Sequence, residues 1–240
     1  MQARRESAEG GRTNGGPAGS LTTADPLAAG RGPGGRPVAL GRRWLWVGLA
    51  GVVLAAAAWP VDQQISSTVA IKDPKGWGEL LFSLPVAVGF YVIMLAILAS
   101  FPNRRRLIAG FLAAVLLSAL LTQGLKIVIG RARPELGLGP RTFQPFDWAG
   151  PFHSFPSGDA SAAMTLALLL GLYFPRARWV FYFYAGWIGI GRVLHSRHFP
   201  SDVLIGWVIG ALAVYVCLRL LGPRFYSPFD QSPATGVSAR

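Results

Sequence analysis

The stretch that decides the fold is "LIAGFLAAVLLSALLTQGLKIVI", residues 107–129, in which Lys126 is the only charged residue. A helix of about 20 apolar residues crosses the roughly 30 Å hydrocarbon core of a bilayer. The stretch therefore predicts a membrane-spanning helix. Three arginines at 104–106 come directly before it and "GRARP" follows at 130–134, so polar loops bound the helix at both ends.

Similar apolar stretches lie on either side of this one, at residues 44–59, 80–100, 159–174, 179–194 and 203–221. Together they predict an all-α polytopic membrane protein with six transmembrane helices packed as a bundle. The stretches at 159–174 and 179–194 are short for a full span. Between the first two, "DQQISSTVAIKDPKGWGE" at 62–79 predicts a short interfacial helix.

Composition supports a membrane protein and sets the domain limits. The chain is 52% hydrophobic and only 14% charged, which exceeds the apolar content of ordinary soluble domains. Residues 1–41 are rich in glycine, proline and arginine, and predict a disordered cytoplasmic tail before a membrane domain at 42–223. Residues 224–240 are expected to be a flexible cytoplasmic terminus. The net charge of +12 suggests nucleic acid, but no basic helix or aromatic-basic platform accompanies it, so we exclude that partner.

Arginines in the short loops predict the orientation. Cytoplasmic loops carry an excess of Lys and Arg, and the arginines that fall on one side are Arg42, Arg43, Arg104, Arg105, Arg106, Arg176, Arg178, Arg219 and Arg224. Both termini are therefore expected to be cytoplasmic in a multi-pass protein. The loops at 130–158 and 195–202 then face outward.

The outer loops also contain basic residues, although the positive-inside rule predicts few of them on that side. Together with the ends of the helical stretches that lead into them, these loops place Lys126, Arg133 and Arg192 at one membrane surface. Arg131 and Arg197 lie at the same surface, and we interpret them as surface cations in contact with lipid headgroups. Ionisable residues at bilayer depth are costly and usually mark a function. Arginine binds phosphate oxygens bidentately and lysine adds a compact charge, so the loops predict a phosphate site.

Two shorter patterns specify the chemistry. Ser157 and Gly158 precede an apolar stretch, where serine can cap a helix and glycine lets its N–H approach an anion. His198 and Asp202 are one helical turn apart. A carboxylate that accepts one imidazole proton leaves the other nitrogen free to attack phosphorus, so we expect a phosphohistidine intermediate.

These motifs, Lys-x6-Arg-Pro at 126–134, Pro-Ser-Gly at 156–158 and Arg-x5-His-x3-Asp at 192–202, resemble those of the type 2 phosphatidic acid phosphatase superfamily, whose core is related to vanadium haloperoxidases. The resemblance spans about residues 44–222 and implies a bacterial lipid phosphatase of the cytoplasmic (inner) membrane, with its active site facing outward. It implies phosphate binding by Lys126, Arg133, Ser157, Gly158 and Arg192. His198 matches the nucleophile and Asp202 its partner.

The sequence departs from the family pattern at two positions. Gly191 replaces a serine before Arg192, and Asp159 stands where the family has a histidine thought to protonate the leaving group. Three interpretations of Asp159 stay open: a replacement general acid, a helix-start residue without a catalytic role, or a residue that positions Arg192, His153 or a water. In the third, His153 or His195 supplies the proton.

We therefore expect a metal-independent phosphatase without a cofactor, acting on a lipid phosphate or diphosphate such as a polyprenyl diphosphate, phosphatidylglycerol phosphate, phosphatidic acid or lipid A. If residue 159 is a less effective proton donor than histidine, a diphosphate or a sugar-linked phosphate is the favoured substrate, because the leaving group of either one needs less protonation. A phosphotransferase of the same superfamily is one alternative, and an anion or lipid transporter is another. The sequence does not determine the oligomeric state.

Overall fold

The structure is a computed structural model that describes residues 43–71, 84–148 and 150–226. Within these ranges the chain is helical apart from its loops and one isolated β-bridge between Arg131 and Phe143. The helices are α1 (Arg43–Ala58), α2 (Asp62–Val69), α4 (Leu84–Ala99), α5 (Arg104–Ile129), α6 (Gly158–Tyr173), α7 (Arg178–Leu194) and α8 (Pro200–Leu221), with 3-10 turns η2 (Trp59–Val61), η3 (Pro134–Leu136), η4 (Gly150–Phe152), η5 (Pro175–Ala177) and η6 (Pro223–Tyr226).

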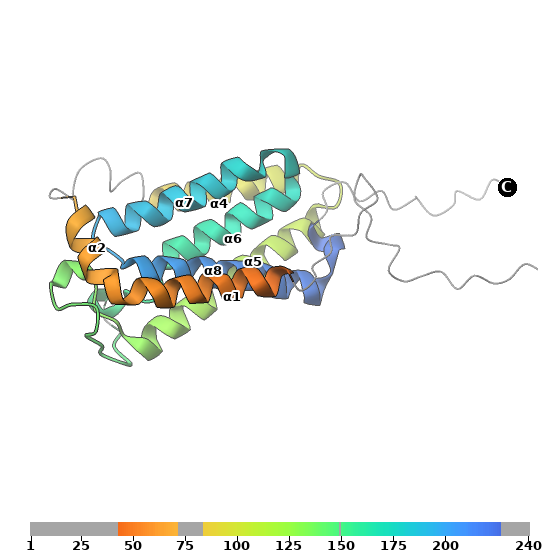
Figure 1. The fold of residues 1–240 in the computed structure, drawn as a ribbon. Helices are drawn as coiled ribbons and strands as arrows, with labels where there is room; N and C mark the ends of the chain where they lie inside the picture. Colours follow the sequence, from red (N-terminus) through yellow and green to blue (C-terminus); the bar gives the residue numbers. More distant parts are fainter. Residues whose placement is uncertain (1–42, 72–83, 149, 227–240) are drawn as a thin grey trace, which may run out of the picture.

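The long helices lie side by side as an elongated bundle (Figure 1), which confirms the predicted all-α class. Helix α8 is central and packs against α6, α1 and α5, while α7 covers α6 and α4 packs on α5. The predicted short helix between the first two stretches is α2, which follows α1 after the η2 turn. The predicted tail at 1–41 and the start of the second apolar stretch at 80–83 lie outside the described residues.

Membrane character is evident in the length and outward faces of the helices. Three helical stretches, 46–69, 104–129 and 200–221, are long and apolar enough to span a bilayer, and α6 is a shorter apolar helix. Leu112, Leu116 and Leu120 lie four residues apart along α5 and are about half exposed. Such a stripe of exposed leucines suits a helix whose outer face contacts lipid. The count of six spans stays a prediction.

Two glycines allow α8 to approach α6 closely. A Cβ added at Gly206 would lie 2.5 Å from the carbonyl oxygen of Ser157, and one added at Gly210 would lie 2.5 Å from that of Ser161. Both distances are far below van der Waals contact, so only glycine fits without moving a helix. Gly206 and Gly210 form a Gly-x-x-x-Gly pattern, which in membrane bundles is typical of close helix contact, and here it serves contact between α8 and α6.

The largest apolar core lies at the end of the bundle that holds the start of α5 and the ends of α6 and α8. Phe111, Leu169 and Val214 are fully buried there. Tyr226 closes this core, because its hydroxyl donates to the carbonyl oxygen of Gly110 at 3.0 Å. Residues 224–226, which we expected to be part of a flexible terminus, are thus the end of η6. Polar groups gather at the opposite end of the bundle, outside this core.

Candidate functional site

Three segments far apart in sequence meet at the polar end of the bundle. They are the end of α5 with its following loop, the start of α6, and the turn between α7 and α8. The backbone N–H of Ser154 donates to the carbonyl oxygen of Arg131 at 3.0 Å, and that of Ser157 donates to the carbonyl oxygen of Asp202 at 2.9 Å. These two hydrogen bonds tie the loop before α6 to both other segments.

His198 lies in the turn between α7 and α8 with its imidazole buried. Its Nδ1 is 2.6 Å from the carbonyl oxygen of Ser154. A carbonyl can only accept, so Nδ1 carries the proton and Nε2 of the neutral ring keeps its lone pair. Burial holds the pKa of His198 well below its usual value, and the nearby charges of Lys126, Arg192 and Arg133 lower it further. The ring is therefore neutral at pH 7.

The three cations that act on His198 are those predicted to bind phosphate. Each lies close enough to His198 to lower its pKa, although they come from the end of α5, the following loop and the end of α7. Burial lowers the pKa of Arg133 from its usual value, and Arg197 and Arg192 add to the effect against the opposing influence of Glu135. Like charges so placed repel one another and attract an anion.

The first turn of α6 faces the same space. Ser157 is the N-cap residue, and its Oγ accepts from the backbone N–H of Ala160 at 3.4 Å. A Cβ added at Gly158 would lie 3.2 Å from Nζ of Lys126, so the ammonium group sits directly against the start of the helix. The free N–H groups and the positive end of the helix dipole favour an anion at this point.

Asp159 forms an ion pair with Arg192, with its Oδ2 3.0 Å from Nε. This is the contact foreseen by the interpretation in which Asp159 positions Arg192. The two auxiliary histidines bond to carbonyl groups near their own positions in the chain. Nε2 of His153 lies 2.9 Å from the carbonyl oxygen of Asp147, and Nδ1 of the buried His195 lies 2.7 Å from that of Gly191.

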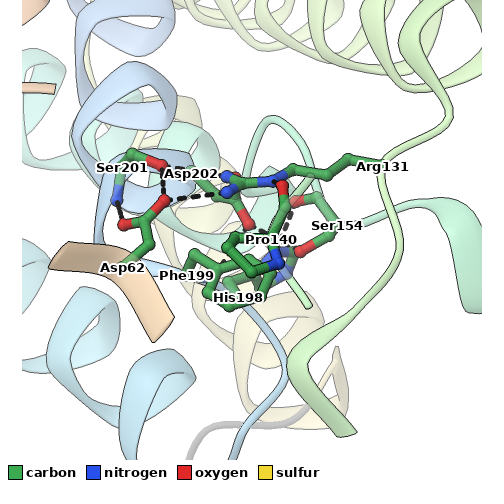
Figure 2. Close-up of polar contacts among 8 residues, drawn as sticks. All are labelled: Asp62, Arg131, Pro140, Ser154, His198, Phe199, Ser201 and Asp202. Carbon is green, nitrogen blue, oxygen red and sulfur yellow. Dashed lines mark hydrogen bonds and ion pairs between the residues drawn. The ribbon is translucent and has the colours of Figure 1, made fainter. Parts of the chain in front are cut away.

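The expected direct pairing of Asp202 with the His198 ring is wrong. The Asp202 carboxylate, in the first turn of α8, accepts from the Ser154 hydroxyl, from a guanidinium N–H of Arg131 and from the backbone N–H of Phe199. Figure 2 shows these contacts, with His198 bonded instead to the Ser154 carbonyl. The carboxylate turns back over its own helix start, where it caps the Phe199 N–H.

The interpretation of Arg131 as a headgroup-binding surface cation is also wrong. Arg131 is fully buried and forms ion pairs with Asp62 and Asp202. Its guanidinium lies over the rings of Trp59 and Phe199, 4.0 Å and 4.3 Å from their centroids. By contrast, Arg197 is partly exposed and pairs with Glu135 at 3.0 Å.

Sequence reasoning missed Asp62. This acid is fully buried at the start of α2 and accepts from the backbone N–H of Ser201 at 3.0 Å. The available signal was an isolated carboxylate directly after the apolar stretch of α1. Its partner residues lie about 70 and 140 positions further along the chain, so no local pattern identifies them.

A cavity of about 380 Å³ adjoins the cationic cluster. This volume lies within the range of roughly 300–1,000 Å³ typical of ligand pockets. Along α5 the lining runs from Lys126 to Val115, a distance of about 16 Å at the usual helical rise, so the cavity extends into the depth of the bundle. The Thr122 hydroxyl is buried in it with no hydrogen-bond partner among the described residues. The lining residues are Tyr91, Val115, Ser118, Ala119, Thr122, Gln123, Lys126, Gly158, Asp159, Ala162 and Thr165.

An apolar helical bundle that gathers three cations, a helix N-terminus and a neutral imidazole at one end defines a membrane protein with an anion site. Within the described ranges, no group of three His, Cys, Asp or Glu side chains has a geometry suited to a metal ion.

The family follows from comparison with known proteins. The chain belongs to the PAP2 superfamily, whose family model matches residues 107–226, half of its length. This matches the resemblance inferred from the three motifs, and the matched region contains all three of them.

Curated relatives of this chain are lipid phosphatases. The chain is 41% identical over 99 residues to the lipid A 1-phosphatase of Rhizobium johnstonii, which covers 40% of this chain and 41% of that protein. It is 25% identical over 134 residues to the undecaprenyl-diphosphatase of Sulfolobus acidocaldarius, which covers 54% of this chain and 63% of that protein. The chain thus spans less than half the length of the Rhizobium relative.

Two solved structures match part of this chain. Aquifex aeolicus LpxE superposes with a TM-score of 0.45 at 26% identity, over 59% of this chain and 81% of that one. The transmembrane PAP2 type phosphatidylglycerolphosphate phosphatase from Bacillus subtilis superposes with a TM-score of 0.48 at 23% identity, over 74% of this chain and 94% of that one.

Proposed function

We propose that this protein is an integral membrane phosphatase that hydrolyses a lipid phosphate or diphosphate through a phosphohistidine. The observation that carries the proposal is the state of His198. Its Nδ1–H is bound by the Ser154 carbonyl at 2.6 Å, and Lys126, Arg192 and Arg133 lie close enough to lower its pKa. A neutral, oriented imidazole surrounded by cations is suited to attack a phosphoryl group.

The reaction has two displacements. Nε2 of His198 attacks phosphorus, the bond from phosphorus to the leaving oxygen breaks, and the electron pair departs with that oxygen. Water then attacks the phosphohistidine, and the P–N bond breaks with its electron pair returning to Nε2. Inorganic phosphate leaves with both protons of the water, so the imidazole is again neutral. Lys126, Arg133, Arg192 and the N–H groups of the first turn of α6 stabilise the charge on the equatorial oxygens in both steps.

Asp159 restricts the substrate class. Its carboxylate pairs with Arg192 at 3.0 Å, so it orients a phosphate-binding cation where the family has a general acid. Substrates whose leaving group departs with little protonation then react best, which favours a lipid diphosphate or the sugar-linked phosphate of lipid A. The relatives named as lipid A 1-phosphatase and undecaprenyl-diphosphatase support these two classes.

We propose that the part of the lipid next to its phosphate occupies the cavity beside Lys126. This cavity reaches from Gly158 at the cationic cluster to Val115 on α5, so a phosphate in the cluster leaves room for attached groups within the bundle. We place the cationic cluster on the outer side of the bacterial cytoplasmic membrane. The exposed arginines at 104–106 and Arg176 lie at the opposite end of the helices, which the positive-inside rule assigns to the cytoplasm.

Phosphate release from a lipid panel tests the proposal. The purified protein is assayed with undecaprenyl diphosphate, phosphatidylglycerol phosphate, phosphatidic acid and lipid A, with His198→Ala as the blank. We expect release from at least one lipid that His198→Ala abolishes. Phosphorylated acceptor without free phosphate identifies a phosphotransferase instead, and equal signals from the two proteins overturn the proposal.

A further inference from the structure

Asp62 belongs to none of the three motifs, yet it contacts the segment that carries His198. It is fully buried at the first residue of α2. Its Oδ1 accepts from the backbone N–H of Ser201 at 3.0 Å. Its Oδ2 accepts from the hydroxyl of Ser201 and from Nη2 of Arg131 at 2.8 Å. Asp62 therefore joins the start of α2 to the first turn of α8.

Arg131 carries this contact further. Its Nη1 donates to Asp202 and, at 2.9 Å, to Ser201, while its Nε donates to the carbonyl oxygen of Pro140 at 2.9 Å. The rings of Trp59 and Phe199 cover the guanidinium at 4.0 Å and 4.3 Å. A planar guanidinium bonded along its edges and covered by rings has one orientation. Figure 2 shows Arg131 between Asp62 and Asp202.

Asp202 completes the connection to His198. One of its oxygens, Oδ2, accepts from the Ser154 hydroxyl and, at 2.9 Å, from the backbone N–H of Phe199. Ser154 supplies the carbonyl that accepts the Nδ1 proton of His198, and Phe199 is the next residue after His198 in the chain. The same carboxylate thus holds the acceptor of the imidazole proton and the backbone beside the imidazole.

We propose that Asp62 is a positioning residue for His198, acting through Arg131, Asp202 and Ser154. The inference rests on the proposed phosphatase function for its kinetic readout. With Asp62 intact, Arg131 has carboxylates on two sides and holds Asp202 and Ser154 at fixed positions. The Ser154 carbonyl then selects the Nδ1–H tautomer, so that Nε2 faces the phosphoryl group.

Asp62→Asn removes one carboxylate while preserving the shape of the side chain. We expect kcat for phosphate release to fall about tenfold to a hundredfold, because small displacements from reactive geometry cost up to about 10²-fold. KM should change little, since Lys126, Arg133 and Arg192 are untouched. Gln63→Asn is the matched control on the exposed face of α2, and it should retain wild-type kcat.

A spectroscopic measurement separates positioning from a merely structural role. The chain has three histidines, so [15N]histidine labelling yields three imidazoles, assigned with His153→Gln and His195→Gln. Wild type should show His198 as the Nδ1–H tautomer. Asp62→Asn should show a mixture of tautomers, and Gln63→Asn the wild-type signal. Unchanged kcat overturns the proposal, and so does a lower kcat with an unchanged His198 signal.

If Asp62→Asn does not fold, Ser201→Ala replaces it as the test variant. It removes only a hydroxyl that accepts from Arg131 and donates to Asp62. It should cause a smaller shift in the same His198 signal, and no shift overturns the proposal. A cycle with Ser154→Ala tests the route: once the Ser154 hydroxyl is gone, Ser201→Ala should cost little more. The spectra need no substrate, so they decide the role of Asp62 even if wild type releases no phosphate from any lipid.

Discussion

The carbonyl oxygen of Ser154 lies 2.6 Å from Nδ1 of His198. A backbone carbonyl therefore orients the candidate nucleophile, and Asp202 acts one step away by binding the Ser154 hydroxyl. A carbonyl carries no full charge, so it selects the tautomer without strongly favouring the imidazolium form. Burial and the neighbouring cations then keep the ring neutral.

The acid limit of activity should lie well below the usual pKa of histidine, about 6.5. Protonation of Nε2 abolishes nucleophilic attack, and burial with three cations lowers the pKa of His198. The ring therefore stays neutral as the pH falls through 6.5 and gains its proton only at a lower pH. Titration of the [15N]histidine signals measures this directly. A His198 midpoint at or above 6.5 would contradict the prediction.

Asp159→His should broaden the substrate range. It restores the acid that the family carries at this position, and general acid catalysis typically contributes about 10²–10⁴-fold. We expect the rate on a lipid monophosphate to rise at least about tenfold relative to the rate on a lipid diphosphate. Asp159→Asn is the control, and it should lower both rates alike because it only loosens Arg192. An unchanged ratio in Asp159→His removes the leaving-group argument.

Activity should survive metal chelation. In the proposed mechanism, Lys126, Arg133, Arg192 and the start of α6 supply the positive charge that stabilises the transferring phosphoryl group. Phosphate release measured before and after dialysis against a chelator should therefore be equal. Loss of activity that a divalent cation restores is the contrary outcome.

Gly210→Ala should destabilise the bundle. The new Cβ would lie 2.5 Å from the Ser161 carbonyl oxygen, and such overpacking typically costs about 1–3 kcal/mol. Gly186→Ala on α7 is the matched control, since nothing lies within 4 Å of its added Cβ. Thermal unfolding in detergent should show a lower Tm for Gly210→Ala and an equal or higher Tm for Gly186→Ala. Equal effects of the two substitutions contradict close packing of α6 on α8.

The sequence alone determined the helices and the cations that gather at one end. The length of an apolar stretch and the polar residues that end it can be read from the local sequence. Helices α5 and α8 therefore begin and end within a few residues of the predicted stretches. The positions of the motifs at helix ends and in the adjoining loops likewise predicted that Lys126, Arg133 and Arg192 would lie at one membrane surface with His198. The influence of all three cations on His198 agrees with this prediction.

Only the tertiary structure decided how the polar groups pair. Arg131 lies only two residues before Arg133, which is predicted to bind phosphate. Arg131 is nevertheless enclosed by Trp59 and Asp62, which come from the first part of the membrane domain. Asp202 has spacing suitable for a direct contact with His198, but its carboxylate accepts hydrogen bonds from Arg131 and Ser154 instead. Hydrogen-bond partners depend on which side chains packing brings within about 3 Å, and residue spacing along one segment carries no information about groups that arrive from another.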